Sequence, residues 1–204
     1  MKQAVIWTLG LSILLSGCAA AITERTSQRA TRVALLAQSR GDWDTARRAW
    51  ARAVFNAERS GYTPDKLAIL TYEYGRALGV TCSFQSSEDE LLRAHELDRQ
   101  AGQPLYLSLT ELARLNLAQK NYRATADYFE RAFRELDAAD APQHAPIAYS
   151  DYLDEYALTL SALGSEERAQ ALRQRALDIR QKHPGKKSIT DTTPYGKFCK
   201  DSAG

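Results

Sequence analysis

Residues 41–53 read GDWDTARRAWARA, and this stretch decides the fold. After the opening glycine, Ala46, Trp50 and Ala53 recur at spacings of four and three, which places them on one face of a helix. Gly41 suits a turn between two paired helices, because glycine is common just beyond a helix C-terminus. The stretch therefore predicts a tight turn followed by an amphipathic helix.

The same pattern recurs in three further blocks of the chain. Its closing alanines, Ala53, Ala94, Ala132 and Ala176, are separated by 41, 38 and 44 residues. Prolines fall at a similar period, at positions 64, 104, 142 with 146, and 184, and helices tend to stop near proline. The third block has Lys120-Asn121-Tyr122, Thr125 and Phe129, and the fourth has Gly164-Ser165-Glu166, Ala169 and Arg173.

This periodic pattern resembles the tetratricopeptide repeat, a helix-turn-helix unit of about 34 residues. In that family a small residue in each first helix lets the second helix approach closely, and a large residue fills the space between units. The small residues here are Ala34, Gly75, Ala113 and Ala157 in the first helices and Ala46, Thr125 and Ala169 in the second; the large ones are Trp50, Leu91 and Phe129. The resemblance covers roughly residues 27–184.

Three departures from the repeat pattern stand out. The second block lacks a turn glycine, so we expect residues 79–84 to form a modified or longer connection. Ser87 stands where a small alanine is expected. Arg173 replaces the aromatic residue in the fourth block, which suits a terminal unit whose outer face meets water.

We therefore predict an all-α fold of four antiparallel helix pairs, stacked as a short right-handed solenoid. The expected pairs are 27–40 with 43–60, 65–80 with 87–101, 105–119 with 122–138, and 147–163 with 166–182. A plain helical bundle is the alternative. The polar residues 185–204 are expected to form a mobile C-terminal tail unless Cys199 pins it.

Composition and charge narrow the function classes. The 204 residues carry 27 Lys and Arg against 25 Asp and Glu, and the formal net charge is +2. A nucleic-acid-binding protein normally has a larger basic excess or a basic block, so we expect no nucleic-acid partner. Charge is uneven, however: between Glu24 and Arg59 there are eight arginines and four acids. This basic region is either a surface for anionic lipid headgroups or a solvated helix face.

The N-terminus has the features of an export signal. Lys2 precedes an uncharged apolar run from Ala4 to Leu15, which is too short for a stable membrane-spanning helix. Residues 15–18, Leu-Ser-Gly-Cys, resemble a bacterial lipobox. The resemblance implies removal of residues 1–17 as a signal peptide, lipidation of Cys18 with chains such as palmitate, and a tether over residues 18–26. An ordinary signal peptide with a chance cysteine is the alternative.

Two features bear on the compartment. In the lipoprotein pattern an aspartate after the lipidated cysteine holds the protein at the inner membrane; Ala19 stands there, which implies the outer membrane, facing the periplasm. Cys82 and Cys199 remain as a pair, and such a pair in an oxidising compartment commonly forms a disulfide. We expect this bridge to press Tyr195 and Phe198 onto the solenoid. Two free thiols are the alternative.

No motif indicates catalysis. The histidines at positions 95, 144 and 183 are far apart in sequence and lack the spacing of a metal site, so neither a metal nor a cofactor is expected. We find no nucleophile elbow and no phosphate-binding glycine loop, and we do not expect an enzyme.

The remaining class of function is the binding of a partner. Stacked helix pairs present an extended concave surface, lined mainly by the first helix of each unit. Arg76 and Arg114 fall at equivalent places in successive units, near Tyr72 and Thr110, and two guanidinium groups there would hold a carboxylate or an acidic peptide. The alternative is that both arginines pair with acids of the solenoid itself.

The sequence thus predicts a membrane-anchored periplasmic scaffold for an envelope protein or peptide, in pilus, secretin or outer-membrane assembly. A regulator or binding module for a cell-wall enzyme or peptide ligand is the second interpretation.

Overall fold

The structure, a computed structural model, describes residues 2–188 and 192–199, without the side chains of residues 2–19. The described chain is helical and contains no strand. The helices are α1 (Lys2–Ser39), α2 (Trp43–Arg59), α3 (Pro64–Val80), α4 (Phe84–Gln100), α5 (Tyr106–Ala118), α6 (Tyr122–Ala138), α7 (Ala141–His144), α8 (Pro146–Ala162) and α9 (Glu166–Lys182).

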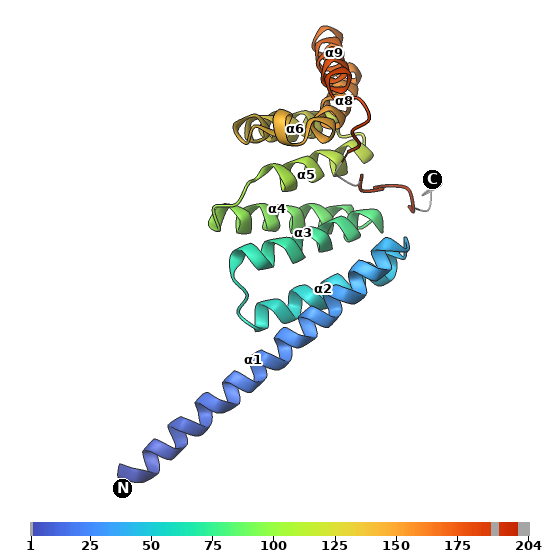
Figure 1. Cartoon of the computed structure of the whole chain (residues 1–204). Helices are drawn as coiled ribbons and strands as arrows, with labels where there is room; N and C mark the ends of the chain where they lie inside the picture. The colour runs from blue at the N-terminus through green and yellow to red at the C-terminus, as the bar shows by residue number, and fades with distance from the viewer. Residues whose placement is uncertain (1, 189–191, 200–204) are drawn as a thin grey trace.

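The helices stack as a solenoid of four tetratricopeptide-like pairs, as the sequence predicts. The pairs are α1 with α2, α3 with α4, α5 with α6, and α8 with α9, here called units one to four. Unit one forms one end of the molecule and α9 the other (Figure 1). The single-turn helix α7 was not predicted; it begins at Ala141, directly before a proline that fits the first turn of a helix.

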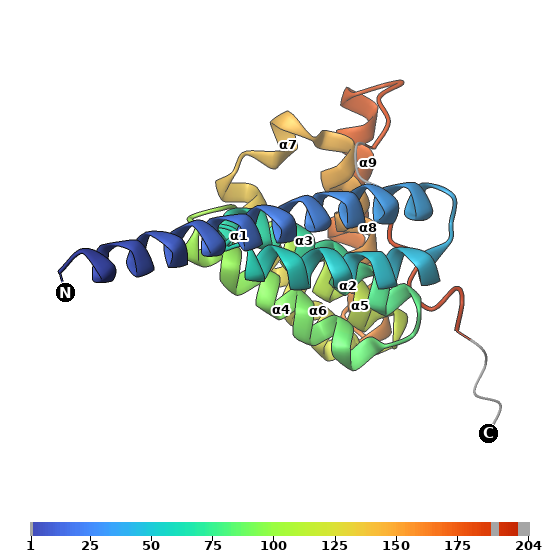
Figure 2. The same ribbon diagram turned by 90° about the horizontal axis from the view of Figure 1, so that it is seen from below.

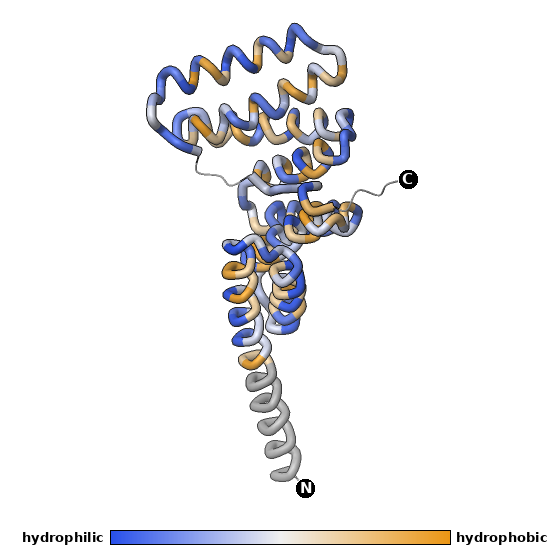
Figure 3. The backbone as a smooth tube through the Cα atoms, turned by 90° about the vertical axis from the view of Figure 1, so that its right-hand side faces the viewer, coloured by the Kyte–Doolittle hydropathy of each residue, from blue (hydrophilic) through white to orange (hydrophobic). Residues whose placement is uncertain are grey.

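The repeat residues occupy the core in the predicted register. The small residues Ala34, Ala113 and Ala157 are fully buried, and so are the four closing alanines. Gly75 shows why the position must be small: a β-carbon there would lie 2.9 Å from Cγ of Leu91. Ser87 Oγ fits the same contact by donating a hydrogen bond to the Gly75 carbonyl oxygen, at 2.7 Å. Along the units, polar and apolar residues alternate accordingly (Figure 3).

The turn in the second unit is modified, as one of the two expectations for residues 79–84 has it. It is not longer than the other turns, so the second expectation is wrong. Each pair is joined by three residues, and the central residue has a positive φ: Gly41 75°, Cys82 68°, Lys120 59° and Gly164 77°. The next amide in each turn bonds back to a carbonyl of the first helix, as in the Ser83 N to Leu78 O bond of 2.9 Å. Cys82 therefore takes the glycine position.

Helix α1 begins well before the predicted start at residue 27. The expected tether, residues 18–26, is part of this helix, because no glycine or proline interrupts the chain between Ala19 and Gly41. The side chain of Cys18 lies outside the described residues. Among the residues described, no helix combines the length and the apolar character needed to cross a bilayer.

Candidate interaction surface

The first helices of units two to four carry a row of alternating charges. Glu73, Glu111 and Glu155 each stand two residues before the small residue of their unit, and Arg76 and Arg114 follow the small residue directly. On one helix, residues three apart are neighbours. Successive units therefore place these five side chains side by side, and we call them the charge ladder.

Each arginine of the charge ladder joins two units. Arg76 Nη1 donates to Glu73 at 2.9 Å within α3, and Arg76 Nε lies 3.8 Å from Glu111 of α5. Arg114 donates to Glu111 within α5 at 3.2 Å and to Glu155 of α8 at 2.8 Å through both Nε and Nη2. The ladder consequently ties α5 to α8 through charge-assisted hydrogen bonds and α3 to α5 through an ion pair.

The charge ladder is largely removed from water. Arg76 is 9% exposed, Arg114 6% and Glu111 2%. Burial favours the neutral form of both arginines, yet the neighbouring carboxylates outweigh it and raise the pKa of each guanidinium above its ordinary value. Burial also raises the pKa of Glu155, in spite of the opposing effect of Arg114. Both guanidinium groups lie over tyrosine rings, Arg76 over Tyr72 at 5.6 Å and Arg114 over Tyr152 at 4.7 Å.

The C-terminal tail covers the middle of the charge ladder. Thr193 Oγ1 accepts a hydrogen bond from Arg76 Nε at 2.8 Å and donates one to Glu111 Oε2 at 2.7 Å. The hydroxyl of Tyr195 donates to the same Glu111 oxygen at 2.8 Å. The ring of Tyr195 lies against Gly79, where an added β-carbon would be 2.5 Å from it. Burial and Glu111 together raise the pKa of Tyr195 well above its ordinary value.

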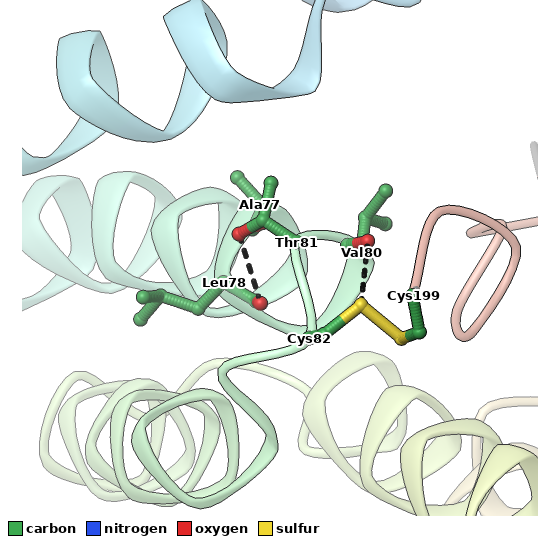
Figure 4. Close-up of a disulfide and its surroundings, with 6 residues drawn as sticks. All are labelled: Ala77, Leu78, Val80, Thr81, Cys82 and Cys199. Atoms are coloured by element: carbon green, nitrogen blue, oxygen red, sulfur yellow. Dashed lines mark hydrogen bonds between the residues drawn. A yellow bond between two sulfur atoms is a disulfide. The ribbon is translucent and has the colours of Figure 1, made fainter. Parts of the chain in front are cut away.

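A disulfide holds the tail in this position, as predicted. Cys82, in the turn between α3 and α4, is bonded to Cys199, and their Cα atoms are 5.5 Å apart (Figure 4). The expectation that both neighbouring rings press onto the solenoid is correct only for Tyr195. Phe198 remains 51% exposed at the edge of a hollow that it lines with Trp43 and Thr81.

The predicted partner-binding residues are brought together but are not open to a ligand. Tyr72 packs against Leu91, Leu112 and Leu115, and Thr110 is 1% exposed. Arg76 and Arg114 are paired with glutamates of the solenoid, which is the alternative left open by the sequence. Since the charge ladder holds three carboxylates and two guanidinium groups, it does not offer a net positive site for an acidic peptide.

Some apolar side chains of the first-helix face are exposed to solvent, in contrast to the buried charge ladder. Leu35, Ile69, Leu107 and Leu158 lie on successive first helices and are 42–64% exposed. Beside the tail there is also a hollow of about 440 Å³, lined by Leu35, Gln38, Ser39, Trp43, Arg76, Thr192 and Pro194. We call the four exposed side chains Leu35, Ile69, Leu107 and Leu158 the apolar row.

Sequence reasoning missed the glutamates of the charge ladder. The signal was present as Glu-x-x-Arg at residues 73–76 and again at 111–114, in the same register of two units. His95 is half-buried, and its Nδ1 lies 2.9 Å from the Ser108 hydroxyl oxygen. Burial, with a smaller contribution from Arg131, lowers the pKa of His95.

The described side chains give no geometry for metal binding: nowhere among them do three His, Cys, Asp or Glu residues converge as a metal site requires. The prediction that the protein is not an enzyme stays a prediction.

Comparison with solved structures identifies the fold. No protein-family model and no curated protein sequence matches the chain. The crystal structure of BtubC (BKLC) from P. vanneervenii aligns with a TM-score of 0.72 at 18% identity, over 81% of this chain and 69% of that one. The crystal structure of MamA protein aligns with a TM-score of 0.47 at 15% identity, over 77% and 93%. Both are helical repeat proteins of the tetratricopeptide type, and the likeness to BtubC shows that this chain has the same fold.

Proposed function

We propose that this chain is a lipid-anchored scaffold of the bacterial envelope, facing the periplasm, which holds a protein partner during assembly of an envelope complex. The observation that carries the scaffold function is the tetratricopeptide-like solenoid, because stacked helix pairs offer a long rigid surface for other proteins. The lipid anchor rests on Leu-Ser-Gly-Cys at residues 15–18. The disulfide supports an exported protein, since such bonds persist in oxidising compartments.

The apolar row is the part of the first-helix face best suited to a partner. Its four side chains are exposed on consecutive helices, whereas the polar groups between them are already engaged by the chain itself. Exposed apolar side chains on rigid elements gain free energy when a partner buries them. We therefore place the partner along the apolar row rather than on the arginines.

The scaffold function is tested by crosslinking the tagged chain in cells and purifying the adducts. We expect one envelope complex to be recovered with the wild type and lost with Ile69→Asp/Leu107→Asp. Leu177→Asp is the matched control, because Leu177 is 50% exposed on α9, away from the apolar row. Recovery of the same complex from both variants would remove the apolar row as the site, and recovery of no protein partner would remove the scaffold function.

The anchor is tested separately by Cys18→Ser. Metabolic labelling with a palmitate analogue should mark the wild type and not the variant, and the variant should leave the membrane fraction. A wild-type chain without label contradicts the lipid anchor and leaves the scaffold function untouched.

A further inference from the structure

Unit one, at one end of the described solenoid, carries a hollow that is open to solvent. The hollow measures about 420 Å³ and lies between α1 and α2, which run side by side at this end of the molecule (Figure 2). Arg29 and Val33 of α1 and Arg48 and Arg52 of α2 form its rims. At its floor is Ala49, which is 8% exposed. We call this the unit-one groove.

The arginines of the unit-one groove have no ion-pair partner among the described residues. None of Arg29, Arg48 and Arg52 forms an ion pair with any residue that the structure describes. The four acids of this region are all engaged elsewhere: Asp42 accepts from the Thr45 amide, Asp44 pairs with Arg47, Glu58 pairs with Arg93 of α4, and Glu24 accepts from Gln28. Arg29 and Arg52 therefore face the groove without an ion-pair partner among the described residues, whereas Arg48 lies near enough to Asp42 to help lower the pKa of that carboxyl group.

The internal junctions show what this groove lacks. In every unit an arginine directly precedes the closing alanine, at positions 52, 93, 131 and 175. Arg93 pairs with Glu58 of the preceding unit, and Arg175 lies 3.5 Å from Asp137 of the preceding unit. These two acids occupy equivalent places, each five residues after a closing alanine near the end of a second helix. The structure describes no unit before Arg52 that could supply such an acid.

Arg131 lacks such an acid in the preceding unit, and its contacts differ accordingly. The equivalent place in unit two is held by Arg99, so no acid is presented to Arg131 from that helix. Arg131 turns instead to Asp127 of its own helix, at 3.7 Å, and lies over the ring of Tyr128. The arginine position thus pairs across a junction wherever the preceding second helix offers a carboxylate.

We propose that the unit-one groove binds an acidic amphipathic helix of a partner protein, which packs on α1 and α2 as the second helix of a preceding unit would. The helix places a carboxylate on Arg52 and others on Arg29 and Arg48, and its apolar side chains fill the space over Ala49 and beside Val33. The exposed apolar residues Val33 and Leu36 of α1, 50% and 57% exposed, extend this contact along α1.

A second copy of this chain does not fit the groove. The terminal second helix, α9, has Gln181 where α2 and α6 have Glu58 and Asp137. It also carries five basic residues against three acidic ones, so its charge repels the groove arginines. Charge complementarity therefore favours a different, acidic chain.

This inference rests on the proposed scaffold function and adds the chemistry of the partner. Its test uses the full chain and two synthetic helices with the same leucine stripe, one bearing glutamates beside the stripe and the other lysines. Binding is followed by fluorescence anisotropy at two salt concentrations. Arg29→Glu/Arg52→Glu is the test variant, and Arg123→Glu/Lys182→Glu is the control, because both of those residues are exposed and lie far from unit one.

We expect the acidic helix to bind the wild type and the control equally and to lose affinity in higher salt. The test variant should bind the acidic helix at least about tenfold more weakly than the wild type does, and it should prefer the lysine helix. The inference is overturned if the acidic helix binds the wild type and the test variant alike, or if it binds neither.

Vesicles of phosphatidylglycerol distinguish a lipid from a protein ligand. If vesicle binding depends on Arg29 and Arg52 while the acidic helix does not bind, the groove is a lipid site and the inference is wrong. If the test variant still yields the envelope complex in cells and the acidic helix fails, the inference falls while the scaffold function stands.

Discussion

Replacing Arg114 by alanine tests whether the charge ladder stabilises the solenoid. Arg114 holds both oxygens of Glu155 and one oxygen of Glu111, at distances from 2.8 to 3.2 Å. Without it, Glu111 keeps Thr193 and Tyr195 as donors, but Glu155 loses every partner that the structure gives it. The variant therefore leaves one largely buried carboxylate uncompensated.

The size of the effect follows from burial. Removing one partner of a buried ion pair costs about 3–5 kcal/mol. The Glu155 side chain is 22% exposed and so regains some hydration, which places the expected loss near the lower figure, about 3 kcal/mol. With a urea m-value of about 2 kcal/mol/M, the unfolding midpoint should fall by about 1.5 M.

The assay is urea unfolding followed by circular dichroism, with Arg134→Ala as the control. Arg134 also contacts a glutamate, at 3.5 Å, but both side chains are more than 60% exposed, and such pairs contribute about 0–1 kcal/mol. Arg114→Ala/Glu155→Gln should recover part of the loss, because it removes the unpaired charge. Equal midpoints for Arg114→Ala and Arg134→Ala would refute the stabilising role of the charge ladder.

The pH dependence of the loss gives an independent check. Burial already raises the pKa of Glu155, and removing Arg114 removes the group that opposes this rise. A carboxyl group whose folded pKa lies above its unfolded value binds its proton more readily in the folded state, so stability increases as pH falls toward the unfolded value, about 4.3. The deficit of Arg114→Ala should therefore shrink between pH 7 and pH 5.

Three further predictions concern the tail and the repeat core. Cys199→Ser should lower the melting temperature by about 10 °C, because the bridge closes 117 residues and the chain-entropy model allows about 5 kcal/mol at most; a reductant should lower the wild-type melt and leave the variant unchanged. Gly75→Ala should cost about 1–3 kcal/mol in chemical unfolding, since its β-carbon would overlap Leu91. Tyr195→Phe should reduce the loss of stability above pH 10, because the pKa of Tyr195 is raised in the folded state: its contribution is present below about pH 10 and is lost at higher pH, where the tyrosine of the unfolded chain ionises before the buried hydroxyl beside Glu111 does.

The fold was readable from the sequence because its signal is local and repeated. Gly75 and Leu91 lie on the two helices of one pair, 16 residues apart, and each unit repeats the same small and large positions. Cys82 and Lys120 take a positive φ at the central position of their turns, where the other two units have glycine, and the shape of the turn is unchanged. Repetition of the pattern thus outweighed single departures from it.

The site was less predictable because its partners come from distant parts of the chain. Projection put Arg76 and Arg114 on one face, but their charge state there depends on Glu111, Glu155 and a tail residue 117 positions away from Arg76. Helical periodicity says which face a residue shares; it does not say which charges of the next unit it meets.

The same residue type serves two purposes in this solenoid, and position along the stack decides which. Arg93 and Arg175 lie at junctions where a preceding helix supplies a carboxylate, so each pairs with an acid of its own chain at the surface. Arg52 repeats that position in unit one, before which the structure describes no further unit, and it lies beside two other arginines of like charge. The proposed partner helix would supply at Arg52 the carboxylate that the preceding second helix supplies to Arg93 and Arg175.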